Sequence, residues 1–452
     1  MPKVAFRQER PFYSNTGDKP CRATRFNGQN IPTEPAKFTF GPRNNPSGPR
    51  RTGGNVSILR LGFFTEVYRP VVNGVVASVE ALAEGLRGRG HQVYCFTPRM
   101  PGYDDPVQPS ATDVLRMPSL PLPTRTPYRL TLPLVSRRNV NNIIKRLSLV
   151  HVHSPFVTGW MGLRYARRYG MPLVYTYHTQ LEAYAHYVPF EPNATRFAAS
   201  QLTRTFANLA DAVVVPTPAM VNHLRELGVS VRIEVVPSGI DVGRFGAGRR
   251  DDVLRADLGA ARTDRLLLCV SRLGKEKNIE ALIDALALSA DRRLKLAIAG
   301  DGPAREELEG HAAAAGVAER IRFLGVVDRD RLPDLYASSD AFVMPSTTET
   351  QGLVQAEALA SGSFVIAADA RSNRDVLGTA GLIVEPTAAG FARGFAAIPP
   401  APSLEIAERA RQAAVRFSIA AQVDRMLNLY ESLLPEQPDM FGPRLTSNIR
   451  SL

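Results

Sequence analysis

Two glutamates eight positions apart, Glu349 and Glu357, are placed where a ligand could be bound. The apolar run 341–344 before them has the brevity of a buried parallel strand, and Gly352 opens a segment of good helix formers. Glu349 is therefore expected in the loop after the strand, and Glu357 about one and a half turns inside the next helix. Ligands bind at this edge of an open α/β sheet. The alternative interpretation is structural, with Glu349 favoured by the helix dipole and Glu357 on a solvated helix face.

Two cations, Arg272 and Lys277, follow another apolar run at 266–270. They fall in the loop and at the start of the helix that are expected after that strand. Fixed cations at this place, together with the N–H groups of a helix N-terminus, suit a diphosphate. The sequence therefore predicts an anion-binding loop here.

Glycines occur in two further loops at expected strand ends. Gly74 follows a strand expected at 58–64, and Gly300-Asp301-Gly302-Pro303 follows one expected at 294–299. The first loop could bring backbone N–H groups onto a phosphate, and the second is a tight turn that lets a ligand approach the backbone. Neither pattern is specific by itself, because Asn-Gly is also an ordinary turn and a lone Gly-x-Gly carries little information.

Two other patterns suggest a metal site only at first sight. His151 and His153 share one face of a strand expected at 148–153, but no Asp, Glu or Cys lies close in sequence to complete a site. Asp328-Arg329-Asp330 spells D-x-D, which we interpret as a helix-start acid and a surface loop. The sequence therefore predicts no metal.

The elements that must position these residues alternate regularly. Short apolar runs and helical patterns follow one another, which indicates parallel sheets flanked by helices. The rhythm breaks at Pro237-Ser238-Gly239 and then resumes, so we predict an α/β protein with two doubly wound, Rossmann-like domains facing each other across a cleft. The predicted parts are a disordered basic tail (1–56), a first domain (57–237), a second domain (238–415), a bracing helix (416–434) and a tail (435–452).

Three segments of the first domain are less regular. The Pro-rich stretch from Pro98 to Pro133 predicts little secondary structure. Cations and apolar residues interleave over 135–147, which indicates either a basic amphipathic helix able to lie on an anionic membrane or a plain solvated helix face. The aromatic-rich loop 180–190 suits contact with a sugar or a lipid, or packs onto the core.

Composition and charge exclude several classes. With 44% hydrophobic and 22% charged residues, the 452-residue chain is typical of globular proteins. It has no apolar run near the roughly 20 residues of a membrane span and no apolar signal core at its start. Three widely spaced cysteines, Cys21, Cys95 and Cys269, favour a reducing compartment. We therefore expect a cytoplasmic chain, or one that lies on a membrane without crossing it.

The net charge of +12 is concentrated at the start of the chain, where residues 1–55 hold ten Lys or Arg against three Asp or Glu. This tail is interpreted as disordered. It could be a membrane-surface or nucleic-acid arm, or lie outside the functional protein. The mildly basic remainder is compatible with anionic lipid or a nucleotide, and does not demand nucleic acid.

Taken together, these motifs resemble the retaining glycosyltransferases of the GT-B fold, family four. The resemblance runs from Ser57 to about Leu434. It rests on four motifs in order, namely Asn73-Gly74-Val75, Ser271-Arg272 with Lys277, Gly300-Asp301-Gly302-Pro303, and the acid pair Glu349 and Glu357. Their order and spacing favour the functional interpretation of the acids. The resemblance implies a nucleotide sugar as co-substrate and no cofactor besides.

The resemblance also assigns roles. Arg272 and Lys277 would neutralise the donor diphosphate, Glu349 would hold hydroxyls of the donor sugar, and Glu357 would bind the ribose. The acceptor hydroxyl would attack from the front face and the leaving phosphate would take its proton, with no protein nucleophile. The predicted catalytic residues are Glu349, Arg272, Lys277 and His178; the donor-binding residues are Gly74, Arg272, Lys277, Gly302, Val327, Glu349, Gly352, Leu353 and Glu357; and the acceptor-binding residues are His178, Tyr184, His186 and Tyr187.

Within the family, residues 176–187 and Glu349-Thr350-Gln351-Gly352 look most like the diacylglycerol α-glucosyltransferases. These are peripheral enzymes of the inner face of the cytoplasmic membrane that pass glucose from UDP-glucose to a lipid hydroxyl. The helix at 135–147, with Trp160 and Met161, would then face an anionic membrane. The alternatives are a related transferase that uses GDP-mannose or UDP-sulfoquinovose, or one with a soluble acceptor. A nucleic-acid binder would depend on the basic tail, and we expect no nucleic-acid partner.

Overall fold

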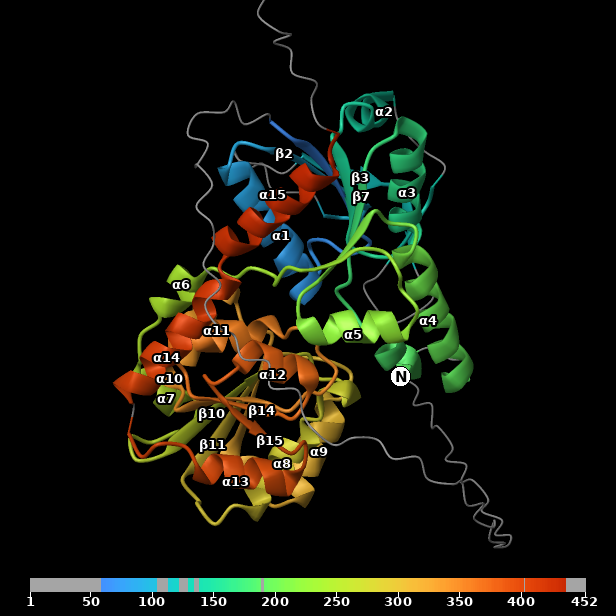
Figure 1. Ribbon diagram of the computed structural model, residues 1–452. Helices are drawn as coiled ribbons and strands as arrows, with labels where there is room; N and C mark the ends of the chain where they lie inside the picture. The colour runs from blue at the N-terminus through green and yellow to red at the C-terminus, as the bar shows by residue number, and fades with distance from the viewer. Residues whose placement is uncertain are drawn as a thin grey trace, which may run out of the picture. The chain divides into compact units, whose positions relative to one another are not determined.

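The computed structural model describes residues 58–103, 113–121, 129–133, 138–187, 191–401 and 403–435. The predicted tails at 1–56 and beyond Pro435 lie outside these residues. Two parallel sheets organise the described chain, each covered by helices (Figure 1). We call the first sheet with helices α1 to α5 and α15 the first half, and the second sheet with α6 to α14 the second half.

The first sheet has seven parallel strands in the order β3-β2-β1-β6-β7-β8-β9. The strands are β1 (Arg60–Phe64), β2 (Gln92–Pro98), β3 (Asp113–Met117), β6 (Leu149–Val152), β7 (Leu173–Thr176), β8 (Ala212–Val215) and β9 (Ile233–Val235). The central strands are short and almost wholly buried, as expected when helices cover both faces. The order reverses between β1 and β6, so a topological switch point lies at their carboxyl ends.

Helices and a small hairpin complete the first half. They are α1 (Gly74–Gly88), α2 (Arg138–Ile144), α3 (Val157–Tyr169), the 3₁₀ helix η1 (Leu181–Tyr187), α4 (Pro192–Ala207), α5 (Pro218–Glu226), and the antiparallel pair β4 (Ser119–Pro121) and β5 (Arg129–Thr131). Helix α1 begins after Asn73, whose side-chain oxygen accepts a 2.9 Å hydrogen bond from the Val76 N–H. The Asn-Gly pair is thus a helix start.

The second sheet has six parallel strands in the order β12-β11-β10-β13-β14-β15. They are β10 (Arg265–Val270), β11 (Leu294–Ala299), β12 (Ile321–Gly325), β13 (Ala341–Met344), β14 (Val365–Ala368) and β15 (Leu382–Val384). Around them lie α6 (Val242–Gly246), α7 (Asp252–Asp257), η2 (Lys275–Lys277), α8 (Glu280–Leu288), α9 (Arg305–Ala314), η3 (Ala318–Arg320), η4 (Arg329–Arg331), α10 (Leu332–Ser338), α11 (Leu353–Ser361), α12 (Arg371–Leu377) and α13 (Ala388–Ala396). The switch point falls between β10 and β13, and two doubly wound domains are confirmed.

The last two helices pack on different halves. Helix α14 (Leu404–Ala414), followed by η5 (Val415–Phe417), contributes Ala410, Ala414 and Phe417 to the core of the second half. Helix α15 (Ile419–Leu433) lies beside α1 (Figure 1) and contributes Met426 and Tyr430 to the core of the first half. The chain therefore ends its described part on the domain where it began.

The prediction of little structure from Pro98 to Pro133 is wrong. Strand β3 pairs with β2 at the edge of the first sheet, and β4 with β5 forms the hairpin. An edge strand has a neighbour on one side only, so it tolerates flanking prolines and shows a weak apolar pattern.

The helix predicted at 135–147 is shorter, and its apolar side is not offered to a membrane. Helix α2 ends at Ile144, and residues 135–137 lie outside the described part of the chain. Ile144 and Leu147 are buried in the core of the first half, whereas Lys145 and Arg146 are exposed. The apolar period here comes from packing, so the amphipathic membrane helix is corrected to a helix that covers the sheet.

Candidate active site

The predicted cations and the predicted loop acid meet at the switch point of the second sheet. Strands β10 and β13 pair directly, so the loops that leave their carboxyl ends are neighbours. Lys277 comes from the first loop and Glu349 from the second, and Nζ of Lys277 lies 2.5 Å from Oε1 of Glu349. The fold thus joins two groups that stand 72 positions apart.

This ion pair is largely withdrawn from water. The Lys277 side chain is 12% exposed and that of Glu349 is 17% exposed. Burial opposes the charge on Lys277, but the carboxylate of Glu349 beside it raises the lysine pKa well above its ordinary value. Lys277 therefore remains a cation at any physiological pH.

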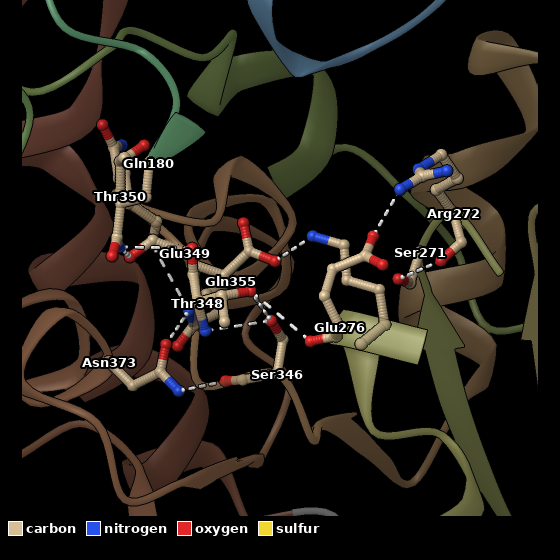
Figure 2. A network of polar contacts seen from close by, with 12 residues as sticks. Gln180, Ser271, Arg272, Glu276, Ser346, Thr348, Glu349, Thr350, Gln355 and Asn373 are labelled. Atoms are coloured by element: carbon tan, nitrogen blue, oxygen red, sulfur yellow. Dashed lines mark hydrogen bonds and ion pairs between the residues drawn. The ribbon is translucent and has the colours of Figure 1, made fainter. Parts of the chain in front are cut away.

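Arg272, the second predicted cation, is also held by a carboxylate. Its guanidinium lies 2.5 Å from Oε1 of Glu276, whose side chain is only 2% exposed (Figure 2). From the first half, the ring of Tyr184 lies over the guanidinium, with its centroid 5.9 Å from the Arg272 carbon. Burial raises the pKa of Tyr184, so its hydroxyl stays neutral. Two cations, two carboxylates and one aromatic ring from opposite halves thus form one cluster.

The Gly-Asp-Gly-Pro turn supports this cluster from behind. A Cβ at Gly300 would lie 1.8 Å from the carbonyl oxygen of Ser271, and one at Gly302 would lie 2.3 Å from that of Leu273. The space that the glycines leave is therefore filled by the backbone of the Arg272 loop. Both glycines are therefore required by this close backbone packing. Donor contact by Gly302 stays a prediction.

A buried amide network fixes the loop that carries Glu349 (Figure 2). Asn373 in α12 donates from Nδ2 to the carbonyl oxygen of Ser346 at 2.9 Å, and its Oδ1 accepts from Nε2 of Gln355 at 2.8 Å. Gly352 adopts a left-handed φ of 75°, and a Cβ there would lie 2.7 Å from the same Gln355 nitrogen. The turn before α11 therefore requires glycine.

The same loop is also held from the first half. Gln180 donates from Nε2 to the carbonyl oxygens of Thr348 and Glu349, each at 3.3 Å (Figure 2). Thr350 donates its hydroxyl to the carbonyl oxygen of His178 at 2.9 Å and accepts at its own carbonyl from the Thr217 hydroxyl, also at 2.9 Å. The position of Glu349 therefore depends on both halves.

The ring of His178 is engaged with another histidine. Its Nε2 lies 3.0 Å from Nδ1 of His153, so one ring donates to the other. His151, on the same strand, bonds the Tyr430 hydroxyl of α15 at 2.7 Å and the Thr176 hydroxyl at 2.6 Å. Burial lowers the pKa of all three histidines, that of His178 to about 4. All three are therefore neutral, and His151 and His153 are held by hydrogen bonds.

Two predicted donor-binding residues face each other across the halves. A Cβ at Gly74, in the first turn of α1, would lie 3.9 Å from Cδ1 of Leu353, in the first turn of α11. Two helix N-termini, each with free N–H groups, therefore approach each other next to Gly352.

The other predicted donor residues lie further along the same edge. Glu357 is 5% exposed and accepts a 3.0 Å hydrogen bond from the Tyr336 hydroxyl. Burial raises the pKa of Glu357, while the charge of Arg329 and the Tyr336 bond oppose that rise. Val327 is half-buried and packs on the core of the second half. Among the described residues, the hydrogen bond of Glu357 goes to Tyr336 and not to the cluster around Lys277. Its role in binding the ribose stays a prediction.

Both carboxylates of the D-x-D motif, Asp328 and Asp330, already have partners within the protein. The Asp328 side chain caps η4 by accepting from the Asp330 N–H at 3.1 Å, and Asp330 pairs with Arg244 at 2.6 Å. The interpretation as a helix-start acid is confirmed. Within the described residues, no group of three or more His, Cys, Asp or Glu side chains could hold a metal ion.

The predicted acceptor side is described only in part. Tyr184 is placed as above, in η1 and not in an irregular loop. His186 and Tyr187 belong to the same 3₁₀ helix, but their side chains lie outside what the structure describes. Trp160 is 41% exposed, as expected, whereas Met161 is 6% exposed and belongs to the core. Neighbouring helix positions point about 100° apart, and on α3 this step carries Met161 onto the core while Trp160 stays on the outer face.

Three features were not anticipated from the sequence. Glu276 pairs with Arg272 through a local i,i+4 contact that the motifs did not single out, whereas Gln351 pairs with Ser238, which stands 113 positions away. The third is a basic face on α3, where Trp160, Arg164, Arg167 and Arg168 are all exposed at helical spacing. Its signal is visible in the sequence, since residues 114–181 hold ten Lys or Arg and no Asp or Glu.

Two Rossmann-like domains with a charged edge at the second switch point define a GT-B glycosyltransferase. The family models agree. Residues 72–244 match Glycosyltransferase Family 4, and residues 251–414 match Glycosyl transferases group 1. The chain belongs to the family 4 glycosyltransferases and is a hexosyltransferase that uses a nucleotide sugar. Among described residues, no helix is both long and apolar enough to cross a membrane.

Relatives with different substrates are similar to this chain. The alpha-monoglucosyldiacylglycerol synthase of Streptococcus pneumoniae is 32% identical over 68% of this chain and 71% of its own length. A GDP-mannose-dependent alpha-mannosyltransferase of Mycobacterium tuberculosis is 33% identical over 71% of this chain and 81% of its own. Anabaena Alr3699/HepE, solved in complex with UDP and glucose, superposes with a TM-score of 0.67 at 20% identity, over 83% of this chain and all of its own.

Proposed function

We propose that this chain transfers a hexose, glucose from UDP-glucose, onto the hydroxyl of a lipid, 1,2-diacylglycerol, with retention of configuration at the anomeric carbon. The observation that carries the proposal is the cluster of Arg272, Lys277 and Glu349 at the switch point of the second sheet. The similarity to the streptococcal synthase supports this choice of donor and acceptor.

The donor diphosphate is expected on the two cations. Arg272 and Lys277 are already oriented by Glu276 and Glu349, so little reorganisation is needed when negative charge grows on the leaving diphosphate. Donor hydroxyls would take over part of the contact that Glu349 makes with Lys277. HepE, which was solved with UDP, supports a nucleoside diphosphate as the leaving group of this proposal.

The reaction then needs one bond formed and one broken. The oxygen of the lipid hydroxyl forms the new bond to the anomeric carbon, and the bond from that carbon to the diphosphate oxygen breaks. The nucleoside diphosphate leaves with the electron pair, and its phosphate oxygen takes the hydroxyl proton. No protein nucleophile, metal or cofactor is part of this proposal. His178, neutral because burial lowers its pKa to about 4, would orient the hydroxyl and not carry a charge.

A lipid acceptor would be met at an anionic membrane surface by the first half. The exposed face of α3 combines Trp160 with Arg164, Arg167 and Arg168. Phe197 on α4 is 66% exposed, and α4 contacts α3 through the ring pair of Phe206 and Trp160 at 5.4 Å. Aromatic rings flanked by arginines suit the headgroup region of a bilayer. Peripheral binding to the inner face of the cytoplasmic membrane is therefore part of the proposal.

The test is a screen of nucleotide sugars with product identified by mass. The full chain is incubated with UDP-glucose, GDP-mannose or UDP-sulfoquinovose and with vesicles of phosphatidylglycerol that contain diacylglycerol. We expect a hexosyl-diacylglycerol from UDP-glucose, and none from Glu349→Gln. Absence of any glycolipid, with turnover only on a soluble acceptor, would reject the lipid acceptor.

A second candidate donor is GDP-mannose. The mycobacterial relative, which covers slightly more of this chain, favours it. The same screen decides between them, because a mannolipid formed from GDP-mannose without product from UDP-glucose would replace glucose by mannose.

A further inference from the structure

Gln351 makes two hydrogen bonds to Ser238. Ser238 lies in the segment 236–241 between β9 and α6, which links the two halves and which we call the connector. Its Oε1 accepts from the backbone N–H of Ser238 at 2.8 Å, and its Nε2 donates to the carbonyl oxygen of the same residue at 3.1 Å. Gln351 is 3% exposed and Ser238 is 7% exposed. Both bonds are therefore shielded from water. Losing either of them would leave a buried polar group without a partner, which lowers stability.

Ser238 is also held from its other side. Its hydroxyl accepts a 2.9 Å hydrogen bond from the hydroxyl of Ser78, which lies in α1. The first turn of α1 in turn carries Gly74, which faces Leu353. A continuous path of contacts therefore runs from α1, through the connector, to the loop of Glu349.

Only a side-chain amide satisfies both groups of Ser238. A glutamate in place of Gln351 would still accept from the N–H, but its second oxygen would face the Ser238 carbonyl oxygen with no proton between them. A methionine would leave the N–H and the carbonyl unpaired in a buried place. Position 351 therefore needs a side chain that both accepts and donates a hydrogen bond, whereas burial alone would also allow an apolar residue.

We propose that Gln351 is a positioning residue for the transfer reaction, one that locks the Glu349 loop to the connector at Ser238 so that the donor site is complete only while the two halves are in contact. This inference rests on the proposed donor site. The backbone bonds of Thr350 and Gln180 point the same way, because each also joins this loop to the first half.

The test compares Gln351→Glu with Asp375→Ala in the full chain. Asp375 also joins the halves, since its Oδ2 accepts from the Ala219 N–H at 2.7 Å, but this bond goes to α5 and not to the Glu349 loop. We expect Gln351→Glu to raise the dissociation constant for the bound nucleoside diphosphate, UDP or GDP, by about tenfold or more. The KM for lipid should stay within about twofold. Asp375→Ala should lower the melting temperature and leave the nucleotide affinity unchanged.

Two results would overturn the inference. One is an unchanged nucleotide affinity in Gln351→Glu, and the other is an equal loss in both variants. Amide hydrogen exchange separates this from a failure of the proposed function, because it needs no substrate. If wild-type chain binds neither UDP nor GDP, faster exchange of residues 346–352 in Gln351→Glu, with no change in Asp375→Ala, still supports the lock, and identical exchange rejects it.

Discussion

The two sheets share one strand order up to the sixth strand, yet their switch points carry different chemistry. At the second, Lys277 and Glu349 stand as charged groups beside Arg272. At the first, the acid that follows β1, Glu66, is fully engaged. Its Oε1 accepts from the N–H and hydroxyl of Thr131, and its Oε2 from those of Thr158.

The residues after β6 and β7 complete the contrast. There the first half presents His153 and His178, both neutral because burial lowers their pKa. The same topology thus offers a charged edge in one half and a neutral, internally bonded edge in the other. A diphosphate would be bound by the former, while the latter supplies uncharged orienting groups. Fold alone does not decide this, because the site lies in the loops.

The largest expected effect comes from the charged edge. Glu349→Gln removes the anion that faces Lys277 and the acceptor for donor hydroxyls, so we expect kcat/KM to fall about a hundredfold or more. The melting temperature serves as the control. Near-normal transfer by a well-folded variant would mean that the acid does not serve the donor.

The corresponding substitution in the first half, Glu66→Gln, is expected to lower the stability of the fold. Glu66→Gln places an amide NH₂ against N–H and hydroxyl donors, so we expect a loss of about 2 kcal/mol or more in the free energy of unfolding. Calorimetric unfolding measures it. If this variant instead folded as well as wild type and lost transfer activity, Glu66 would be a catalytic group and the contrast would fail.

A smaller effect is expected for the surfaces. Reversing Arg164, Arg167 and Arg168 to glutamate should cut co-sedimentation with phosphatidylglycerol vesicles several-fold, because each cation near an anionic surface contributes roughly 1 kcal/mol. The matched control reverses three exposed arginines of the second half, namely Arg249, Arg262 and Arg292. If both triple variants lost vesicle binding equally, the proposal that α3 faces the membrane would be rejected.

The smallest effect is on the pH dependence of stability. His151, His153 and His178 have lowered pKa values when folded and about 6.5 when unfolded. The unfolded chain therefore binds more protons below that pH, and the melting temperature should fall as pH drops from about 6.5 toward 4. His153→Asn should weaken this dependence. Identical profiles for wild type and this variant would contradict buried neutral histidines.

Much of this architecture could be predicted, because buried parallel strands are short apolar runs that punctuate the chain. The positions of Arg272, Lys277 and Glu349 at strand ends followed from the same pattern. What could not be predicted is which strand ends meet. The contact of Lys277 with Glu349 depends on β10 pairing with β13, and strand order is not written in local sequence.

Other misses have equally physical causes. The burial of Gln351 could not be predicted, because it pairs with a residue 113 positions away. Glu276 is only four positions from its partner Arg272, but this spacing is too common on helices to single it out. The pattern near α2 left a membrane helix and a plain solvated helix face open, because burial against a sheet and burial in a bilayer select the same apolar residues. The basic face of α3 has one signal in the sequence, which is the absence of Asp and Glu from residues 114–181.

The central claim is that the charged edge of the second half binds the donor diphosphate. Titration calorimetry of wild type and Arg272→Gln with UDP, UMP, GDP and GMP tests it most directly. We expect one nucleoside diphosphate to bind wild type more tightly than its monophosphate, and Arg272→Gln to weaken the diphosphate about tenfold or more with a smaller effect on the monophosphate. An unchanged dissociation constant for the diphosphate in Arg272→Gln would contradict the account.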